Sequence, residues 1–272
     1  MDEREIIART PEPRTRATLA ADLRALGLSP GDVVLAHSSL SSLGWVCGGP
    51  VAVVQALMDA LTEAGTLVMP AHTGGLSDPA GWENPPVPRR WWETIREAMP
   101  AFDPATTPTH GMGAIPEAFR RWPGVLRSSH PHVSFAAWGR HAERVTGGHS
   151  LDYSLGEGSP LARLYELDAK VLLLGVGYES NTSFHLAEYR APGAEPARPG
   201  APVFKGGERV WTTYEDIELH EELFPEIGTR FEEAGSVAVG RVGSAEARLF
   251  SQREAVDHAR AWLERRRAGP GR

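Results

Sequence analysis

The sequence is poor in cysteine, in long apolar runs and in basic charge. Cys47 is the only cysteine among 272 residues, which excludes an internal disulfide and a zinc site built from cysteines. No run of about 18 apolar residues occurs, so no membrane-spanning helix and no membrane partner are expected. The acidic, polar N-terminus lacks the basic and apolar regions of a signal peptide. Together these absences favour a cytoplasmic protein.

Basic residues are outnumbered, and the formal net charge is -7 at pH 7. A nucleic-acid-binding protein usually presents a basic patch or stripe. Here the visible basic run, residues 265–267, lies near the C-terminus beside glycine and proline. We therefore expect no nucleic acid partner, and an acidic protein better suits a cationic one. Residues 1–14 and 265–272 are predicted to be frayed ends.

The apolar pattern predicts an α/β fold in which helices flank a mixed central sheet. Strands are expected at residues 33–37, 66–70, 133–138, 170–174 and 237–250, with a hairpin at 203–213 that turns at Gly206 and Gly207. Helices are expected at residues 15–26, 51–61, 91–98, 116–121, 160–167, 182–189 and 253–265. No repeat or clear linker divides the chain, so residues 1–272 are predicted to form one domain.

The first candidate for chemistry follows the strand at residues 170–174, where a glycine loop leads into a helix. His185 and Glu188 are three residues apart on that helix and share one face. A carboxylate beside an imidazole fixes its tautomer and raises its basicity, as a general base for an amine requires. The pair could also be surface neighbours without a function. As metal ligands they would need partners from elsewhere, and the other histidines show no zinc spacing.

Two polar loops could bind an anion. Residues 38–44 follow a strand, and small residues there let backbone amides and hydroxyls converge on a phosphate. Arg127, Ser128 and His130 combine a cation, a hydroxyl and an imidazole. The first loop could equally be a helix cap or a plain polar loop. The second could be a loop whose arginine pairs with a nearby acid.

Acidic side chains gather at residues 214–222, which include Asp216, Glu218, Glu221 and Glu222. Such a run is usually a solvated face. It could instead hold a polyamine through charge-assisted hydrogen bonds. Asp78, in a loop after the strand at residues 66–70, is a further candidate for this role.

Several motifs occur in a fixed order along the chain. They are HSSLSSLGWVCGG from His37, GTLVMP from Gly65, FDPATTPT from Phe102, RSSHPHVSFAAWG from Arg127, GEGSP from Gly156 and LLLGVGYESNTSFHLAE from Leu172. This ordered set resembles the antibiotic N-acetyltransferase family, whose best-known members are aminoglycoside 3-N-acetyltransferases. The resemblance covers roughly residues 15–263. The fold of the other large acetyltransferase superfamily is not expected. Its phosphate loop has the pattern Arg/Gln-x-x-Gly-x-Gly/Ala, and no such segment leading into a helix is found here.

The resemblance implies direct transfer of an acetyl group from acetyl-CoA to the 3-amino group of a 2-deoxystreptamine antibiotic, which confers resistance. It implies His185 as the base and Glu188 as its partner, without a metal. The residues it places on the CoA side are Ser38, Ser39, Leu40, Ser41, Ser42, Gly44, Thr106, Thr107, Arg127, Ser128 and His130. Those it places at the cationic aminoglycoside are Asp78, Asp216 and Glu218. A monomer or a homodimer is expected.

Other functions remain open at this point. The chain could acetylate a different amine, act as a metal-dependent hydrolase through His185 and Glu188, or bind an aminoglycoside without modifying it. Cys47 could carry the acyl group in a two-step scheme. We disfavour that scheme because Cys47 lies in a glycine loop with no histidine nearby in sequence.

Overall fold

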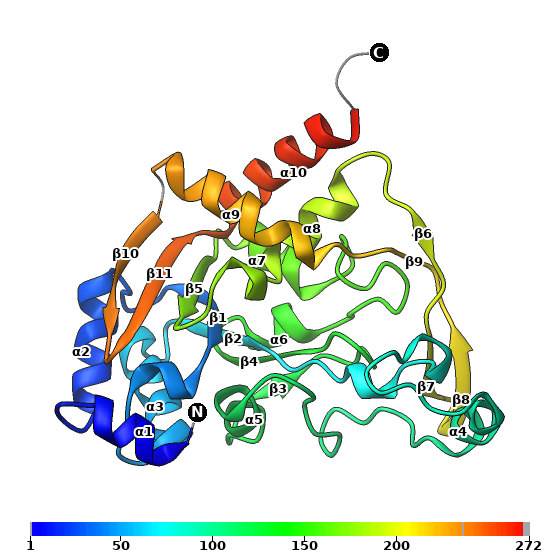
Figure 1. Ribbon diagram of the computed structural model, residues 1–272, viewed down its shortest axis with the longest axis horizontal. Coiled ribbons are helices and arrows are strands. Elements are labelled where there is room, and N and C mark those ends of the chain that lie inside the picture. The colour runs from blue at the N-terminus through cyan, green and yellow to red at the C-terminus, as the bar shows by residue number, and fades with distance from the viewer. Residues whose placement is uncertain (1, 236, 269–272) are drawn as a thin grey trace.

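The computed structural model describes residues 2–235 and 237–268, and a seven-stranded sheet forms its centre (Figure 1). The strands of this sheet are β1 (Val33–Ser38), β2 (Thr66–Pro70), β3 (Leu126–Arg127), β4 (Phe135–Gly139), β5 (Lys170–Leu174), β10 (Val237–Val242) and β11 (Ala245–Ser251). Their order across the sheet is β10-β11-β5-β1-β2-β4-β3. Strands β5, β1 and β2 pair in parallel, and the pairs outside them are antiparallel. The predicted α/β fold with a mixed central sheet is confirmed.

Helices cover both faces of the sheet (Figure 1). They are α1 (Glu3–Arg9), α2 (Arg16–Leu26), α3 (Gly49–Leu61), α4 (Trp92–Ala98), α5 (Ala114–Arg120), α6 (Ala142–Thr146), α7 (Pro160–Glu166), α8 (Ser183–Arg190), α9 (Phe224–Glu233) and α10 (Gln252–Ala268). Helices α2, α3 and α5 contribute to the apolar core on one face. Helices α6 to α10 contribute to the core on the other face.

The central strands are apolar because both of their faces are buried. Along β1, Val34 and Ala36 belong to the core beneath α2 and α3, while Leu35 belongs to the opposite core. Side chains alternate between the faces of a strand, so His37 shares the face of Leu35. That is the face covered by α8, the helix that carries His185.

Two short strand pairs stand away from the main sheet. Strands β7 (Gly200–Lys205) and β8 (Glu208–Thr213) form the predicted hairpin. Gly206 and Gly207 have φ values of 59° and 85° at its turn, which glycine adopts without steric cost. Strand β6 (Pro196–Ala197) pairs with β9 (Asp216–Ile217). Figure 1 shows the hairpin beside α4, at the end of the molecule remote from α2.

The described parts of both ends are structured, contrary to the predicted fraying. Residues 3–9 form α1, and the backbone N–H of Trp45 donates to Thr10 Oγ1 at 2.9 Å. Helix α10 continues to Ala268, and Arg267 donates from its Nη1 to the backbone oxygen of Ala191 at 3.1 Å. These contacts supply partners that local sequence cannot reveal. The remaining predicted ends, residues 1 and 269–272, lie outside the described residues.

Candidate active site

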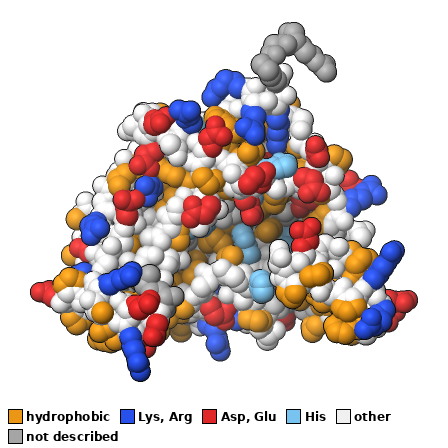
Figure 2. Space-filling model, in the orientation of Figure 1, with side chains coloured by type: hydrophobic (Ala, Val, Ile, Leu, Met, Phe, Trp, Pro, Cys, Tyr) orange, Lys and Arg blue, Asp and Glu red, His pale blue; other side chains and the backbone are white. Residues whose placement is uncertain are grey.

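His185 lies in a cavity at the edge of the sheet where parallel strands end. In open α/β sheets, ligands bind outside the carboxyl ends of such strands. The cavity has a volume of about 330 Å³. Its polar lining side chains are His37, Ser38, His72, Glu179, Ser180, Thr182, His185 and Glu221. Figure 2 shows histidines in a hollow at the centre of one face, with acidic side chains above it.

Glu188 fixes the orientation of the His185 ring. The Nδ1 atom of His185 lies 2.7 Å from Glu188 Oε2, and the two side chains are only 5% and 1% exposed. The other carboxylate oxygen, Oε1, accepts the backbone N–H of His220 at 2.8 Å. A carboxylate accepts hydrogen bonds, so the ring proton is assigned to Nδ1. Atom Nε2 is then the basic atom, as a general base requires.

A second carboxylate, that of Glu221, stands opposite the basic atom. Its Oε1 lies 3.5 Å from His185 Nε2, and its side chain is 70% exposed. It comes from the short helix η6 (Glu221–Leu223), 36 positions along the chain from His185. Burial lowers the pKa of His185, but hydrogen bonds to Glu188 and Glu221 outweigh burial and raise that pKa above its ordinary value. The sequence indicated Glu221 only as part of an acidic run.

The surroundings of two further histidines of the cavity lower their pKa, whereas those of His185 raise its pKa. Burial is the main cause that lowers the pKa of His37 and of His72 to about 3 in each case. The nearby His185 lowers both pKa values further. Both rings are therefore uncharged at neutral pH. Sequence reasoning did not propose either as a functional residue, although each stands at or just after the end of a predicted strand.

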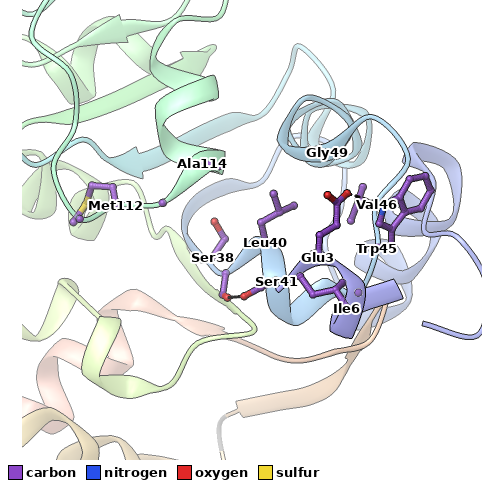
Figure 3. Close-up of a pocket in the computed structure, with 14 residues that line it drawn as sticks. Glu3, Ile6, Ser38, Leu40, Ser41, Trp45, Val46, Gly49, Met112 and Ala114 are labelled. Carbon is purple, nitrogen blue, oxygen red and sulfur yellow. Dashed lines mark hydrogen bonds between the residues drawn. The ribbon is translucent and has the colours of Figure 1, made fainter. Parts of the chain in front are cut away.

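A wider cavity of about 530 Å³ lies next to the first and shares Ser38, Gly111 and Met112 with it. Five predicted CoA residues line it, namely Ser38, Ser39, Leu40, Ser41 and Gly44. Figure 3 shows Ser38, Leu40 and Ser41 on one side, and on the other Met112 and Ala114, the first residue of α5. Residues of α1, including Glu3 and Ile6, complete the wall. The contact of these residues with CoA stays a prediction.

Ser42, the sixth residue predicted in this loop, points elsewhere. Its hydroxyl donates to the backbone oxygen of Gly175 at 3.0 Å and lies within hydrogen-bond distance, 2.9 Å, of Ser39 Oγ. Gly175 has φ +70°, and a Cβ there would lie 2.5 Å from the Cβ of Ser42. Glycine is therefore needed for the close approach of the two loops that end β1 and β5. Ser42 holds the loop in place rather than lining the cavity.

The structure does not bring Arg127, Thr106 or Thr107 to either cavity. The guanidinium of Arg127 donates to the backbone oxygen of Ala71 at 2.6 Å and also to that of Thr107. The Thr106 N–H donates to Asp103 Oδ1 at 3.0 Å, and the Thr107 hydroxyl accepts the N–H of Asp103 at 2.9 Å. These groups brace a loop, and their predicted place on the CoA side stays a prediction.

Ser128 and His130 are also internal. They are 1% and 0% exposed. Ser128 Oγ accepts the N–H of Phe135 at 2.9 Å, and His130 Nδ1 accepts that of Val133 at 3.1 Å. These groups have protein partners and do not line the wider cavity, and their expected place beside CoA stays a prediction.

The three residues predicted to bind the acceptor lie in two different places. Asp216 and Glu218 line a third cavity of about 450 Å³. Asp216 is buried and accepts the hydroxyl of Tyr189, whereas Glu218 is exposed. Asp78 forms an ion pair with Arg96 at 2.7 Å and lines none of these three cavities. Its place at the acceptor also stays a prediction. The role of Asp216 and Glu218 stays a prediction.

The model of the family described as aminoglycoside 3-N-acetyltransferase matches residues 35–264 of this chain. The chain belongs to this family. It is 53% identical, over 96% of both chains, to the SPbeta prophage-derived aminoglycoside N(3')-acetyltransferase-like protein YokD of Bacillus subtilis (strain 168). It is 40% identical, over 100% of both chains, to aminoglycoside N(3)-acetyltransferase VII of Streptomyces paromomycinus.

Solved structures of aminoglycoside 3-N-acetyltransferase type agree with the fold. The crystal structure of YokD from Bacillus subtilis has a TM-score of 0.97 at 51% identity and covers 98% of this chain and 100% of its own. The structure of AAC-IIIb binary with CoASH has a TM-score of 0.84 at 36% identity, covering 96% and 100%. These findings confirm the predicted family, fold and class, an N-acetyltransferase with acetyl-CoA as co-substrate.

The described residues also show what surrounds Cys47 and whether metal-ligand side chains cluster. Over residues 2–235 and 237–268, no group of three or more His, Cys, Asp or Glu side chains is placed to hold a metal ion. Cys47 is exposed and does not line the cavity of His185.

Among residues 2–235 and 237–268, no helix is both long and apolar enough to cross a membrane.

Proposed function

We propose that this protein acetylates the 3-amino group of a 2-deoxystreptamine aminoglycoside by direct transfer from acetyl-CoA, with His185 as general base. One observation carries the proposal. The Nε2 atom of His185, freed by the hydrogen bond from Nδ1 to Glu188, belongs to a cavity that meets the wider cavity at Ser38. A base is thus placed where an amine and a thioester can meet.

The wider cavity suits CoA, since it offers the Ser39 and Ser41 hydroxyls together with the apolar surfaces of Leu40 and Val46. Backbone and hydroxyl groups of this kind hold phosphate oxygens and polar linkers. Acetyl-CoA would enter there with its thioester directed toward Ser38. The residues present therefore fit the co-substrate, which supplies the activated acetyl group.

The acceptor arrives as an ammonium group, which first loses one proton to solvent water and so becomes a neutral amine that can attack. Glu221 lies 3.5 Å from His185 Nε2, so we place the ammonium between these two side chains. His185 accepts a second proton, that of the neutral amine, as the amine nitrogen forms its bond to the carbonyl carbon. Glu188 stabilises the imidazolium that results. The carbon–sulfur bond then breaks, and the thiolate of CoA takes the proton from His185.

The remaining ammonium groups of the acceptor meet further acids. Glu179 lines the cavity of His185, and Glu218 and Asp216 line the third cavity. Charge-assisted hydrogen bonds from ammonium to carboxylate are strong and directional. Relatives of known structure include AAC-VIa bound to sisomicin and a mutant of AAC(3)-IVa in complex with a gentamicin. We propose acceptors of this kind, and resistance to them as the outcome.

We also propose a cytoplasmic location, where an exposed free thiol such as that of Cys47 stays reduced. The protein is proposed to act as a monomer or a homodimer.

Mass spectrometry of sisomicin and gentamicin after incubation with acetyl-CoA tests the function. We expect a gain of one acetyl group with the wild-type protein, at a rate that a chelator does not change, and little product with His185→Ala. NMR of the product should place the acetyl group on the 3-amine. A different position or acceptor would indicate another amine acetyltransferase. Drug binding without any product would indicate a sequestering protein and refute the proposal.

A further inference from the structure

We propose that the imidazoles of His37 and His72 donate hydrogen bonds from Nε2 to the acetyl carbonyl oxygen and hold the oxyanion that forms during transfer. The proposal rests on the acetyl transfer proposed above. It assigns separate roles to three histidines of one cavity, with His185 as the base and the other two as oxyanion donors.

The fold places both donors at one edge of the sheet. His37 is the last residue but one of β1, and His72 follows the end of β2 by two residues. These strands are parallel neighbours, so their carboxyl ends meet. Both imidazoles line the cavity of His185, and Ser38 beside His37 belongs also to the CoA cavity. A thioester at Ser38 is therefore next to both rings.

Unpaired buried atoms mark the place where the carbonyl oxygen would lie. The Nε2 atoms of His37 and His72 and the hydroxyl of Ser38 are buried, and none has a hydrogen-bond partner among the described residues. His37 is only 6% exposed. Because most buried polar groups in proteins are paired, three unpaired ones around one cavity call for an acceptor supplied by a ligand. The thioester carbonyl is such an acceptor.

The charge state of the two rings suits this role. Burial lowers the pKa of each to about 3, so each keeps a single N–H at neutral pH and does not give up a proton. The pKa of His185 is instead raised by its two carboxylate neighbours. Environments that push the pKa values of neighbouring groups apart separate the base from groups that only donate hydrogen bonds.

The proposed step balances without another reactant. The amine nitrogen bonds to the carbonyl carbon, and the carbonyl π electrons move to the oxygen, where His37 and His72 donate. The proton of the amine goes to His185. The oxygen then re-forms the double bond, and the carbon–sulfur electron pair leaves with CoA as the thiolate, which takes the proton. Both donor histidines end the cycle unchanged.

The test compares His37→Leu, His72→Leu and His72→Gln, with His258→Leu as the matched control. His258 also has a buried Nε2 without a partner among the described residues, but it lies in α10 and lines none of the active-site cavities. Each leucine variant should lower kcat by about 10²–10³-fold, the usual cost of one oxyanion donor. His72→Gln keeps an N–H donor and should recover part of the loss.

Two further readouts separate this role from a merely structural one. The KM for acetyl-CoA and the Kd for CoA should change little, and the pH midpoint of kcat/KM should stay with His185. The infrared carbonyl stretch of bound ¹³C-acetyl-CoA should fall below its value in water and return toward it in the leucine variants. Wild-type kcat in both leucine variants would overturn the proposal.

If those variants do not fold, the wild-type spectrum decides alone, and a carbonyl stretch equal to that in water overturns the proposal. Failure of the acetyl transfer itself is distinguishable. It would show as a wild-type protein that forms no product, whereas failure here leaves wild-type product formation intact.

Discussion

Glu221 offers a direct way to alter the base without touching it. Its carboxylate lies 3.5 Å from His185 Nε2 and, after burial, is one of the two groups that set the pKa of that ring. The substitution Glu221→Gln removes the charge and keeps the size. Because a negative neighbour favours the protonated imidazole, its loss should lower the pKa of His185.

The separation sets the magnitude. Two unit charges 3.5 Å apart in water interact by about 1.2 kcal/mol, which corresponds to roughly one pKa unit. The value for water is the fully screened limit, because the Glu221 side chain is 70% exposed while that of His185 is only 5% exposed. The acid limb of kcat/KM rises as His185 loses its proton, and in the wild type its midpoint should lie above the ordinary histidine value of about 6.5. Glu221→Gln should move that midpoint down by about one unit or more.

The assay is a profile of kcat/KM between mildly acidic and mildly alkaline pH with one acceptor for all variants, so that the acceptor's own ionisation cancels. Glu222→Gln is the matched control, because Glu222 lies next along the chain yet contacts His220 at 3.0 Å rather than His185. An unmoved midpoint in Glu221→Gln, or an equal shift in the control, would refute the assigned role of Glu221.

Three other predictions concern two further glutamates, Glu188 and Glu218, and two buried histidines. Glu188→Gln should lower kcat by about 10²–10⁴-fold with little change in either KM, because an amide does not stabilise the imidazolium of His185. Steady-state kinetics measures this, and a kcat equal to that of the wild type would contradict it. Glu218→Gln should raise the acceptor KM about tenfold, more so at low salt, without changing that for acetyl-CoA; titration of each substrate at two ionic strengths checks it. Burial holds the pKa of His130 at about 2 and that of His149 at about 4, so each binds a proton on unfolding. The stability they contribute is present above about pH 6.5 and is lost as pH falls, by about 1.4 kcal/mol per pH unit each until the folded pKa is approached; urea unfolding between pH 7 and 5 measures it, and a flat free energy of unfolding would contradict it.

Those parts of the fold that depend on local runs and spacings of apolar and polar residues could be predicted from the sequence. Strand β5 is apolar after Lys170 because the sheet is covered on both faces, and the spacing of His185 and Glu188 places them on one helix face, where they are in contact. Helices α6 and α9 were not predicted. Helix α6 has only five residues, which are too few to show a helical repeat of apolar positions. Helix α9 begins just after the acidic run, which the sequence pattern indicates only as one polar segment.

The site beyond that pair depends on contacts between distant segments, which no local pattern records. Glu221 reaches His185 from 36 positions away, and His72, which follows β2, lines the same cavity. Ser128 and His130 look like ligand-binding residues in the sequence, yet both are buried with protein partners. A polar side chain that binds a ligand and one that stabilises a core can be the same residue type and equally buried, and only the fold shows which of them lines a cavity.

Helix α1 has a practical consequence for work with this protein. Glu3 and Ile6 form part of the wall of the wider cavity, so a purification tag fused ahead of Glu3 starts at the mouth proposed to admit acetyl-CoA. Figure 1 shows the end of α10 on the opposite side of the molecule. An affinity tag or surface tether attached beyond Ala268 leaves that mouth clear, and immobilisation through this end is the orientation to choose for binding measurements.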